Sequence, residues 1–254
     1  LDQAVKVHNP LSLDHEYMRL SLLPNLLAIL KKNAQTQEGL ELFELSRVYH
    51  QKVYPVLPEN LVSEELERER LAGLFYRKEY DMRFAHQNVM SVLEYINSTI
   101  GLRGVVYEQV VSTAGLPVEI NMYHPGRVGV VKIDQEIIGY YGQIHPRLQK
   151  SLGLIKPVFM FELSMDVLIS NSRLVRTYEA FSVYPKTTES LSLVIGNRIP
   201  VGSVISAVKN SDERVKSVIL KDIFQNESVS EGMVVVTLDV SYQRLDGVIA
   251  SSEA

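Results

Sequence analysis

The apolar residues of one early stretch recur at the spacing of an α-helix. Leu22, Leu26 and Leu30 fall on one face of a predicted helix that ends near Asn33. Ser21 stands just before this face and is a good candidate for the N-cap, because its hydroxyl can accept from a free backbone N–H of the first turn. Such a stripe packs either on the core of its own chain or against a partner, and the spacing leaves both readings open.

A second helical pattern begins at Asp81 and ends before Gly101, a residue type typical of the position after a helix. The stretch 57–70 is polar and acidic and is expected to be an exposed connection. Asp134-Gln135 is placed as the tight turn of a hairpin. These features and the predicted strands indicate an α+β fold, in which an antiparallel sheet is layered with helices. The predicted strands are 40–50, 71–76, 105–111, 127–133, 137–144 and 158–163.

The pattern restarts after a polar stretch at 171–177, which is expected to be a linker. The elements predicted beyond it are a strand, a helix and two strands, at 190–195, 201–209, 215–224 and 233–242. This order is the first part of a ferredoxin-like βαββαβ unit, whose last helix and strand would begin near Ser251. The predicted domains are therefore 1–170 and an incomplete 178–254, and both chain ends are expected to be cut.

The composition is that of an ordinary globular protein, with 46% hydrophobic and 22% charged residues among 254. The absence of cysteine excludes disulfides and thiolate zinc sites and favours a cytoplasmic location. No apolar run approaches the roughly 20 residues that span a bilayer. The net charge of −4 excludes a strongly basic nucleic-acid binder, so any RNA contact must come from a local patch.

The chain carries no recognisable catalytic or phosphate-binding motif, and its six histidines lack metal-ligand spacing. His124-Pro125 and His145-Pro146 are expected to set turns in which each ring bonds a backbone group, rather than to serve acid–base chemistry. A site that activates a substrate with ATP needs arginines over the phosphates and acidic residues for Mg²⁺. Nothing in the sequence brings the available arginines together, namely Arg47, Arg127 and Arg147.

Several short strings occur in the order found in one known family. They are His8-Asn9-Pro10-Leu11-Ser12, the stretches 19–27 (RLSLLPNLL) and 42–49 (LFELSRVY), His124-Pro125-Gly126-Arg127, the stretch 138–146 (IGYYGQIHP) and Phe161-Glu162-Leu163. In this order the chain resembles the class II synthetase-like core of the bacterial-type phenylalanine-tRNA ligase beta subunit. Because the strings extend over nearly the whole first domain, the resemblance is specific.

The resemblance implies a core that is not itself catalytic and has no metal ligands or cofactor of its own. ATP, Mg²⁺ and phenylalanine would belong to the alpha subunit of the full enzyme, which attaches phenylalanine to tRNA. The implied partners are that alpha subunit and tRNA(Phe), in an assembly of two alpha and two beta subunits, with no membrane. The helix with Leu22, Leu26 and Leu30 would lie at the subunit interface.

The second domain is similar to the ferredoxin-fold anticodon-binding domain that closes the same subunit. The strings concerned are Tyr184-Pro185, the stretch 191–195 (LSLVI), Asp222-Ile223-Phe224 and Val240-Ser241-Tyr242-Gln243. This similarity and the RNA-binding chemistry of aromatic and basic side chains give the candidate tRNA-binding residues, Tyr184, Lys186, Lys221, Phe224 and Tyr242. Phe224 and Tyr242 could equally be core residues of their strands.

This chain departs from the domain's usual pattern at two places. After Tyr184-Pro185 it has Lys186-Thr187-Thr188-Glu189 where the domain has Arg and Asp, and Gly232-Met233-Val234 stands for the usual Gly-Lys-Lys. Two other functions stay open: a free-standing class II-like enzyme that activates a small amino acid, and a non-enzymatic module that senses a small ligand. The first needs an arginine cluster on the core sheet.

Overall fold

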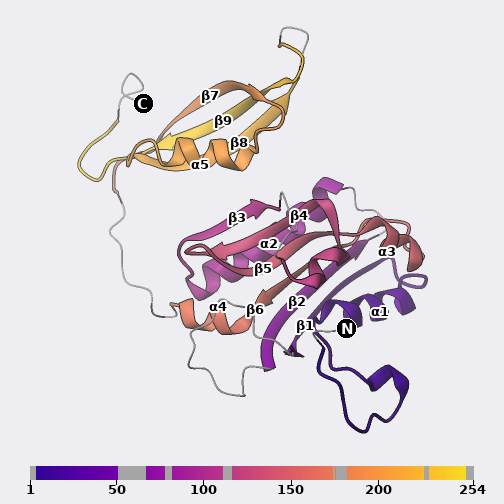
Figure 1. Ribbon diagram of the computed structural model, residues 1–254. Coiled ribbons are helices and arrows are strands. Elements are labelled where there is room, and N and C mark those ends of the chain that lie inside the picture. The colour runs from indigo at the N-terminus through magenta and orange to yellow at the C-terminus, as the bar shows by residue number, and fades with distance from the viewer. Residues whose placement is uncertain are drawn as a thin grey trace. The chain divides into compact units, whose positions relative to one another are not determined.

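The computed structural model describes residues 4–50, 67–77, 82–110, 116–173, 175, 182–225 and 229–249 (Figure 1). The chain divides into two compact units, Leu1–Arg176 and Thr177–Ala254. No helix among the described residues is long and apolar enough to cross a membrane.

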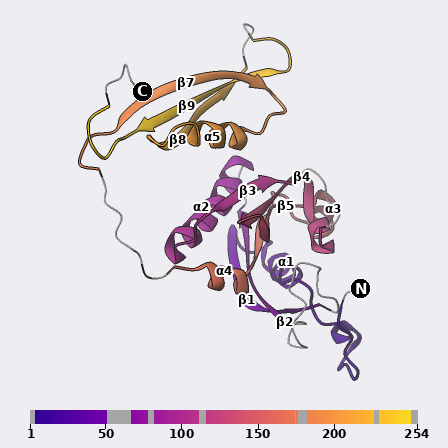
Figure 2. The same ribbon diagram turned by 60° about the vertical axis from the view of Figure 1, so that its left-hand side comes forward.

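The first unit is built on a six-stranded sheet with the strand order β1-β2-β6-β5-β4-β3, in which every neighbouring pair is antiparallel. Helix α1 covers one face, and helices α2 and α4 cover the other (Figures 1 and 2). The strands are β1 (Gly39–Tyr49), β2 (Glu67–Arg77), β3 (Val105–Gln109), β4 (Tyr123–Ile133), β5 (Glu136–Ile144) and β6 (Phe159–Ser164). The helices are α1 (Leu23–Asn33), α2 (Met82–Ile100), α3 (Pro146–Ser151) and α4 (Met165–Asn171), with the short 3₁₀ helices η1 (Leu13–His15) and η3 (Val118–Met122).

The sheet separates two apolar cores, as the alternation of side chains along a strand requires. On β2, Leu74 and Tyr76 point into the core beneath α1, whereas Phe75 points into the core beneath α2. The predicted α+β class with an antiparallel sheet is thus confirmed for this unit. Helix α4 is a finding that the hydrophobic pattern did not predict.

Helix α1 begins one residue later than a Ser21 N-cap would require, because the N-cap is Leu22. The backbone N–H of Leu22 and the hydroxyl of Ser21 each donate to the carboxylate of Glu162 on β6, both at 2.8 Å. The Ser21 hydroxyl also accepts from the backbone N–H of Leu23 at 3.1 Å. The carboxylate of Glu162 and the hydroxyl of Ser21 therefore accept hydrogen bonds from the first backbone N–H groups of this helix.

The predicted interface residues of α1 are core residues of this chain. Leu22, Leu26 and Leu30 are 0%, 2% and 0% exposed, packed on the sheet. They cannot contact a partner while this unit is folded, so their assignment to a subunit interface was wrong. The large apolar residue that α1 presents to solvent is Ile29, which is 44% exposed.

Strand β2 begins earlier than predicted and takes in residues that were expected to be an exposed connection. Pairing with β1 extends to Glu67, and Arg47 of β1 forms ion pairs with Glu67 at 2.5 Å and Glu69 at 3.7 Å. Polar side chains are suited to this end of the β1–β2 pair, because β1 is the edge of the sheet and the end is exposed to solvent. The remainder of that stretch, 57–66, lies outside the described residues.

Two turns follow the prediction closely. Gly101 ends α2 with φ of +69°, the left-handed conformation that favours glycine after a helix. Asp134 and Gln135 join β4 to β5 with φ of 48° and 76°, as a type I′ hairpin turn requires.

The second unit is a three-stranded antiparallel sheet in the order β7-β9-β8 with one helix on one face. Its elements are β7 (Thr187–Gly196), α5 (Val201–Lys209), β8 (Val215–Phe224) and β9 (Met233–Tyr242). Val236, Leu238 and Val240 of β9 form its buried centre beneath α5. The other face of the sheet is open and carries a ladder of hydroxyl groups, including the contact between Ser192 and Thr237 at 3.1 Å.

Candidate nucleic-acid interface

Three strand ends meet at one end of the second unit. Because β9 runs antiparallel to both of its neighbours, Tyr242 near the end of β9 pairs with Thr187 at the start of β7 and Val215 at the start of β8. The chain segments just before β7 and β8 and just after β9 are thereby brought side by side, although they are far apart in sequence. The backbone N–H of Gln243 donates to the carbonyl of Arg214 at 2.9 Å.

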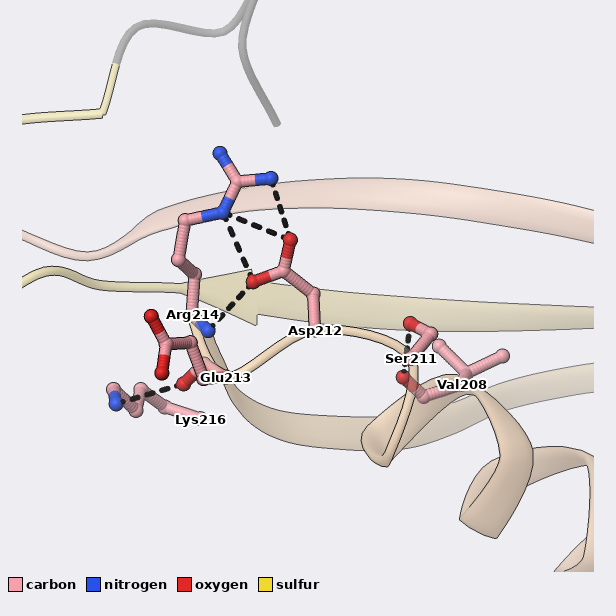
Figure 3. Close-up of polar contacts among 6 residues, drawn as sticks. All are labelled: Val208, Ser211, Asp212, Glu213, Arg214 and Lys216. Atoms are coloured by element: carbon pink, nitrogen blue, oxygen red, sulfur yellow. Dashed lines mark hydrogen bonds and ion pairs between the residues drawn. The ribbon is translucent and has the colours of Figure 1, made fainter.

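Arg214 lies at the centre of this end and is held by Asp212 (Figure 3). Its Nε donates to both carboxylate oxygens of Asp212 at 3.0 and 2.9 Å, and one terminal nitrogen donates at 2.6 Å. The backbone N–H of Arg214 donates to the same carboxylate at 2.8 Å. These hydrogen bonds, with the positive charge of Arg214, lower the pKa of Asp212 to about 2. The guanidinium is therefore fixed in direction.

A hollow of about 640 Å³ lies beside this pair, lined by Asp212, Glu213, Arg214, Lys216 and residues 243–246. Lys216 is fixed in part by the carbonyl of Glu213, to which its Nζ donates at 3.0 Å. Among the described residues, four cations gather at this end of the sheet, against three nearby anions. The cations are Lys186, Arg214, Lys216 and Arg244, and the anions are Asp212, Glu213 and Asp246. The patch is mixed in charge, which favours phosphate contacts of modest salt dependence.

Two of the predicted tRNA-binding residues lie at this end. Tyr184 is partly buried, and its carbonyl accepts from Nε2 of Gln243 at 2.6 Å. Lys186 is exposed, directly before β7. A third, Tyr242, belongs to the same end, but it packs with the core beneath α5 and so is only partly exposed.

The other two predicted residues lie on the open face of the sheet. Lys221 contacts Asp239 at 3.4 Å and the Ser190 hydroxyl at 3.3 Å, so part of its charge is balanced within the sheet. Phe224 pairs with Val235 at the far end of β8 and is 40% exposed. The structure therefore does not gather the five residues in one surface, and their contact with tRNA stays a prediction.

Arg214, Lys216 and Arg244 were missed by the sequence reasoning. The available signal was the position of Arg214 and Lys216 at the start of one predicted strand and of Arg244 just after another. If the two strands are paired antiparallel, these ends must meet. The order of the strands in the sheet, which the pattern did not predict, was needed to use that signal.

Two of the arginines considered for an ATP site, Arg47 and Arg127, lie far apart in the sheet of the first unit. Arg47 lies on β1 and Arg127 on β4, and three strands lie between them. At about 4.8 Å between neighbouring strands, the two backbones are about 19 Å apart. The described residues also hold no group of three or more His, Asp or Glu side chains that could bind a metal ion.

The two His-Pro sequences form turns as predicted. Nδ1 of His124 accepts from the backbone N–H of Gly126 at 3.0 Å, and Nδ1 of His145 accepts from the backbone N–H of Arg147 at 3.1 Å. Each ring is thus a structural acceptor at the turn.

The sheet of the first unit, with helices on both faces, is a class II synthetase-like fold. A solved structure with this fold is PylSc, a pyrrolysyl tRNA synthetase of Desulfitobacterium hafniense, with a TM-score of 0.51 and 12% identity over 68% of this chain and 56% of that chain. At this identity the similarity shows the fold alone.

Residues 1–165 match the family model described as the phenylalanyl tRNA synthetase beta chain CLM domain, and the chain belongs to this family. Among similar curated proteins, the phenylalanine–tRNA ligase beta subunit of Geobacter sulfurreducens is 28% identical over 98% of this chain and 30% of its own length. The beta subunit of Carboxydothermus hydrogenoformans is 25% identical over 100% of this chain and 31% of its own length. The chain thus spans less than a third of the length of these relatives.

Proposed function

We propose that this chain is part of the beta subunit of a phenylalanine-tRNA ligase. Its first unit is a scaffold that binds the catalytic alpha subunit, and its second unit contacts tRNA(Phe). The observation that carries this proposal is the family match over residues 1–165, supported by relatives similar over both units. ATP, Mg²⁺ and phenylalanine are bound by the alpha subunit, in a cytoplasmic assembly of two alpha and two beta subunits.

Strand β1 supports a partner surface on the first unit. It is an edge strand, and the alternation along it turns Phe43 and Leu45 to solvent, where they are 79% and 55% exposed. Two large apolar side chains on an open edge are typical of a surface that another protein covers. We therefore place the alpha subunit against this edge instead of against the core face of α1.

The strand order of the second unit supports a ferredoxin-like domain. A helix between its first two strands and the order β7-β9-β8 agree with the first part of a βαββαβ unit. Leu191, Leu220 and Ile223 are in register with the buried residues of β9 on the α5 face, yet are 37%, 39% and 45% exposed. That leaves room on this face for the second helix of such a unit.

The interaction with RNA is assigned to the end of the sheet that carries Arg214, Lys216 and Arg244. In filter binding with a tRNA(Phe) transcript, Arg244→Gln and Lys216→Gln should each weaken binding and reduce the slope of log affinity against log salt by about 0.7–0.9. Lys209→Gln is the matched control, because Lys209 is exposed at the end of α5. Equal losses in all three variants would remove this assignment.

The same proposal assigns catalysis to the alpha subunit. The purified chain should not support phenylalanine-dependent exchange of pyrophosphate into ATP, whereas the complete enzyme should. Exchange activity in the chain alone would contradict the scaffold role and favour the free-standing enzyme.

A further inference from the structure

A hollow of about 510 Å³ lies on the α2 side of the sheet in the first unit, well apart in sequence from the residues of the RNA-binding end. This volume is within the range of small-molecule sites. His86 and Gln87 of α2 line one side of the hollow, and Gln109 of β3, Arg127 of β4 and Tyr141 of β5 are among the other lining residues.

Aromatic rings form the base of this hollow. Tyr141 and Phe159 are 9% and 2% exposed, and the ring of His86 lies with its centroid 6.3 Å from the centroid of each. Gly129 makes this arrangement possible, because a Cβ at that position would lie 2.6 Å from the Tyr141 hydroxyl oxygen. The rings are inclined to one another, at 51° for His86 and Tyr141 and 80° for His86 and Phe159, so they offer faces and edges to an aromatic ligand ring.

The charge of the hollow is positive. Arg127 is oriented by Gln143, a buried side chain whose Oε1 accepts from the guanidinium at 2.8 Å. None of the described lining residues is acidic. Burial lowers the pKa of His86, so its ring is neutral at pH 7 and the cation is Arg127. An arginine in such a setting favours a carboxylate, which can accept two parallel hydrogen bonds.

Tyr141 contributes a second polar group to the hollow. Among the described residues, none forms a hydrogen bond with the Tyr141 hydroxyl, which belongs to the wall of the hollow. Burial raises the pKa of Tyr141, so the hydroxyl keeps its proton and remains a donor. A hydroxyl that is mostly enclosed and lacks a partner favours an acceptor supplied by a ligand or by water.

We propose that this hollow binds a small aromatic carboxylate, whose ring lies on Tyr141 and Phe159 and whose carboxylate meets Arg127. The inference rests on the geometry of the hollow and does not depend on the proposed function. No reaction is assigned to the site.

The test is a calorimetric titration of the whole chain with sodium benzoate, benzamide and benzylamine. Benzoate should bind, and benzamide and benzylamine should bind at least about tenfold more weakly, because neither offers a charged acceptor to Arg127. Absence of benzoate binding at millimolar concentrations, or equal binding of benzamide, overturns the proposal.

Substitutions locate the binding site. Arg127→Gln should raise the benzoate Kd at least about tenfold, and Tyr141→Phe should raise it by a smaller factor. Lys150→Gln, which removes one cation from exposed α3, should leave the Kd unchanged. Benzoate should also shift the imidazole resonances of His86, identified by their loss in His86→Gln. Unchanged affinity in Arg127→Gln, or an unmoved His86 signal during benzoate binding, contradicts the assignment to this hollow.

Discussion

Glu162 connects the sheet to helix α1, and its removal tests how that helix is held. Glu162→Ala removes the acceptor of two hydrogen bonds, from the Ser21 hydroxyl and the Leu22 backbone N–H, each 2.8 Å long. Hydrogen bonds to a charged group contribute about 1.5–3 kcal/mol each, and relief of the buried charge offsets part of that loss. We expect the free energy of unfolding to fall by about 2–4 kcal/mol.

Urea unfolding followed by far-UV circular dichroism measures this change. Glu94→Ala is the matched control, because Glu94 is exposed on α2, and it should change stability by no more than about 0.5 kcal/mol. In a double-mutant cycle, Ser21→Ala and Glu162→Ala should be non-additive, since they share one hydrogen bond. A Glu162→Ala protein as stable as the wild type would refute the proposed role of this carboxylate.

The pH dependence of the same residue has a definite sign. Burial raises the pKa of Glu162 above its ordinary value, although its hydrogen bonds to Leu22 and Ser21 oppose the rise. In the range between the ordinary and the raised pKa, the folded state binds more protons than the unfolded state. The stability of wild type relative to Glu162→Gln should therefore be highest below the ordinary pKa and fall as the pH rises through this range. If urea titrations over this pH range showed that the stability of wild type relative to Glu162→Gln rises with pH, the raised pKa of Glu162 would be contradicted.

Two further predictions concern packing in the first unit. Leu26→Ala should lower the free energy of unfolding by about 2–5 kcal/mol, because it opens a cavity beneath α1, whereas Ile29→Ala on the exposed side of the same helix should cost less than about 1 kcal/mol. Equal effects in urea titrations would argue against the orientation of α1. Gly129→Ala should lower the free energy of unfolding by about 1–3 kcal/mol, since the new methyl group would clash with the ring of Tyr141. In a double-mutant cycle, adding Tyr141→Ala should recover part of the stability that this clash costs.

Local patterns in the sequence were sufficient for much of the fold. The helical pattern between Asp81 and Gly101 predicted α2, and the pair Asp134-Gln135 predicted a hairpin, because both features depend on residues close together in the chain. The predicted N-cap at Ser21 was wrong by one residue, because the N-cap is Leu22 and the start of the helix is held by a distant side chain. The carboxylate partner of Ser21 is 141 residues away, so no local pattern could have revealed it.

The same limit applies to the functional surfaces. Helical spacing identified the stripe of Leu22, Leu26 and Leu30, but spacing cannot say whether a stripe meets its own sheet or a partner, and here it meets the sheet. The end of the second unit with Arg214 and Arg244 depends on how β8 and β9 pair, which is a long-range property. The resemblance of the sequence was enough to predict the family. The candidate functional surfaces could be located only from the structure.

In the function proposed above, this chain is a scaffold that binds a catalytic partner through the edge strand β1. The most direct test is to mix the chain with purified phenylalanine-tRNA ligase alpha subunit and measure the mass of the complex by size-exclusion chromatography with light scattering. We expect a stoichiometric complex that is lost in Phe43→Asp and Leu45→Asp but kept in Val106→Asp, which alters the opposite edge of the sheet where Val106 is 46% exposed. Separate elution of the two folded wild-type proteins would contradict the claim.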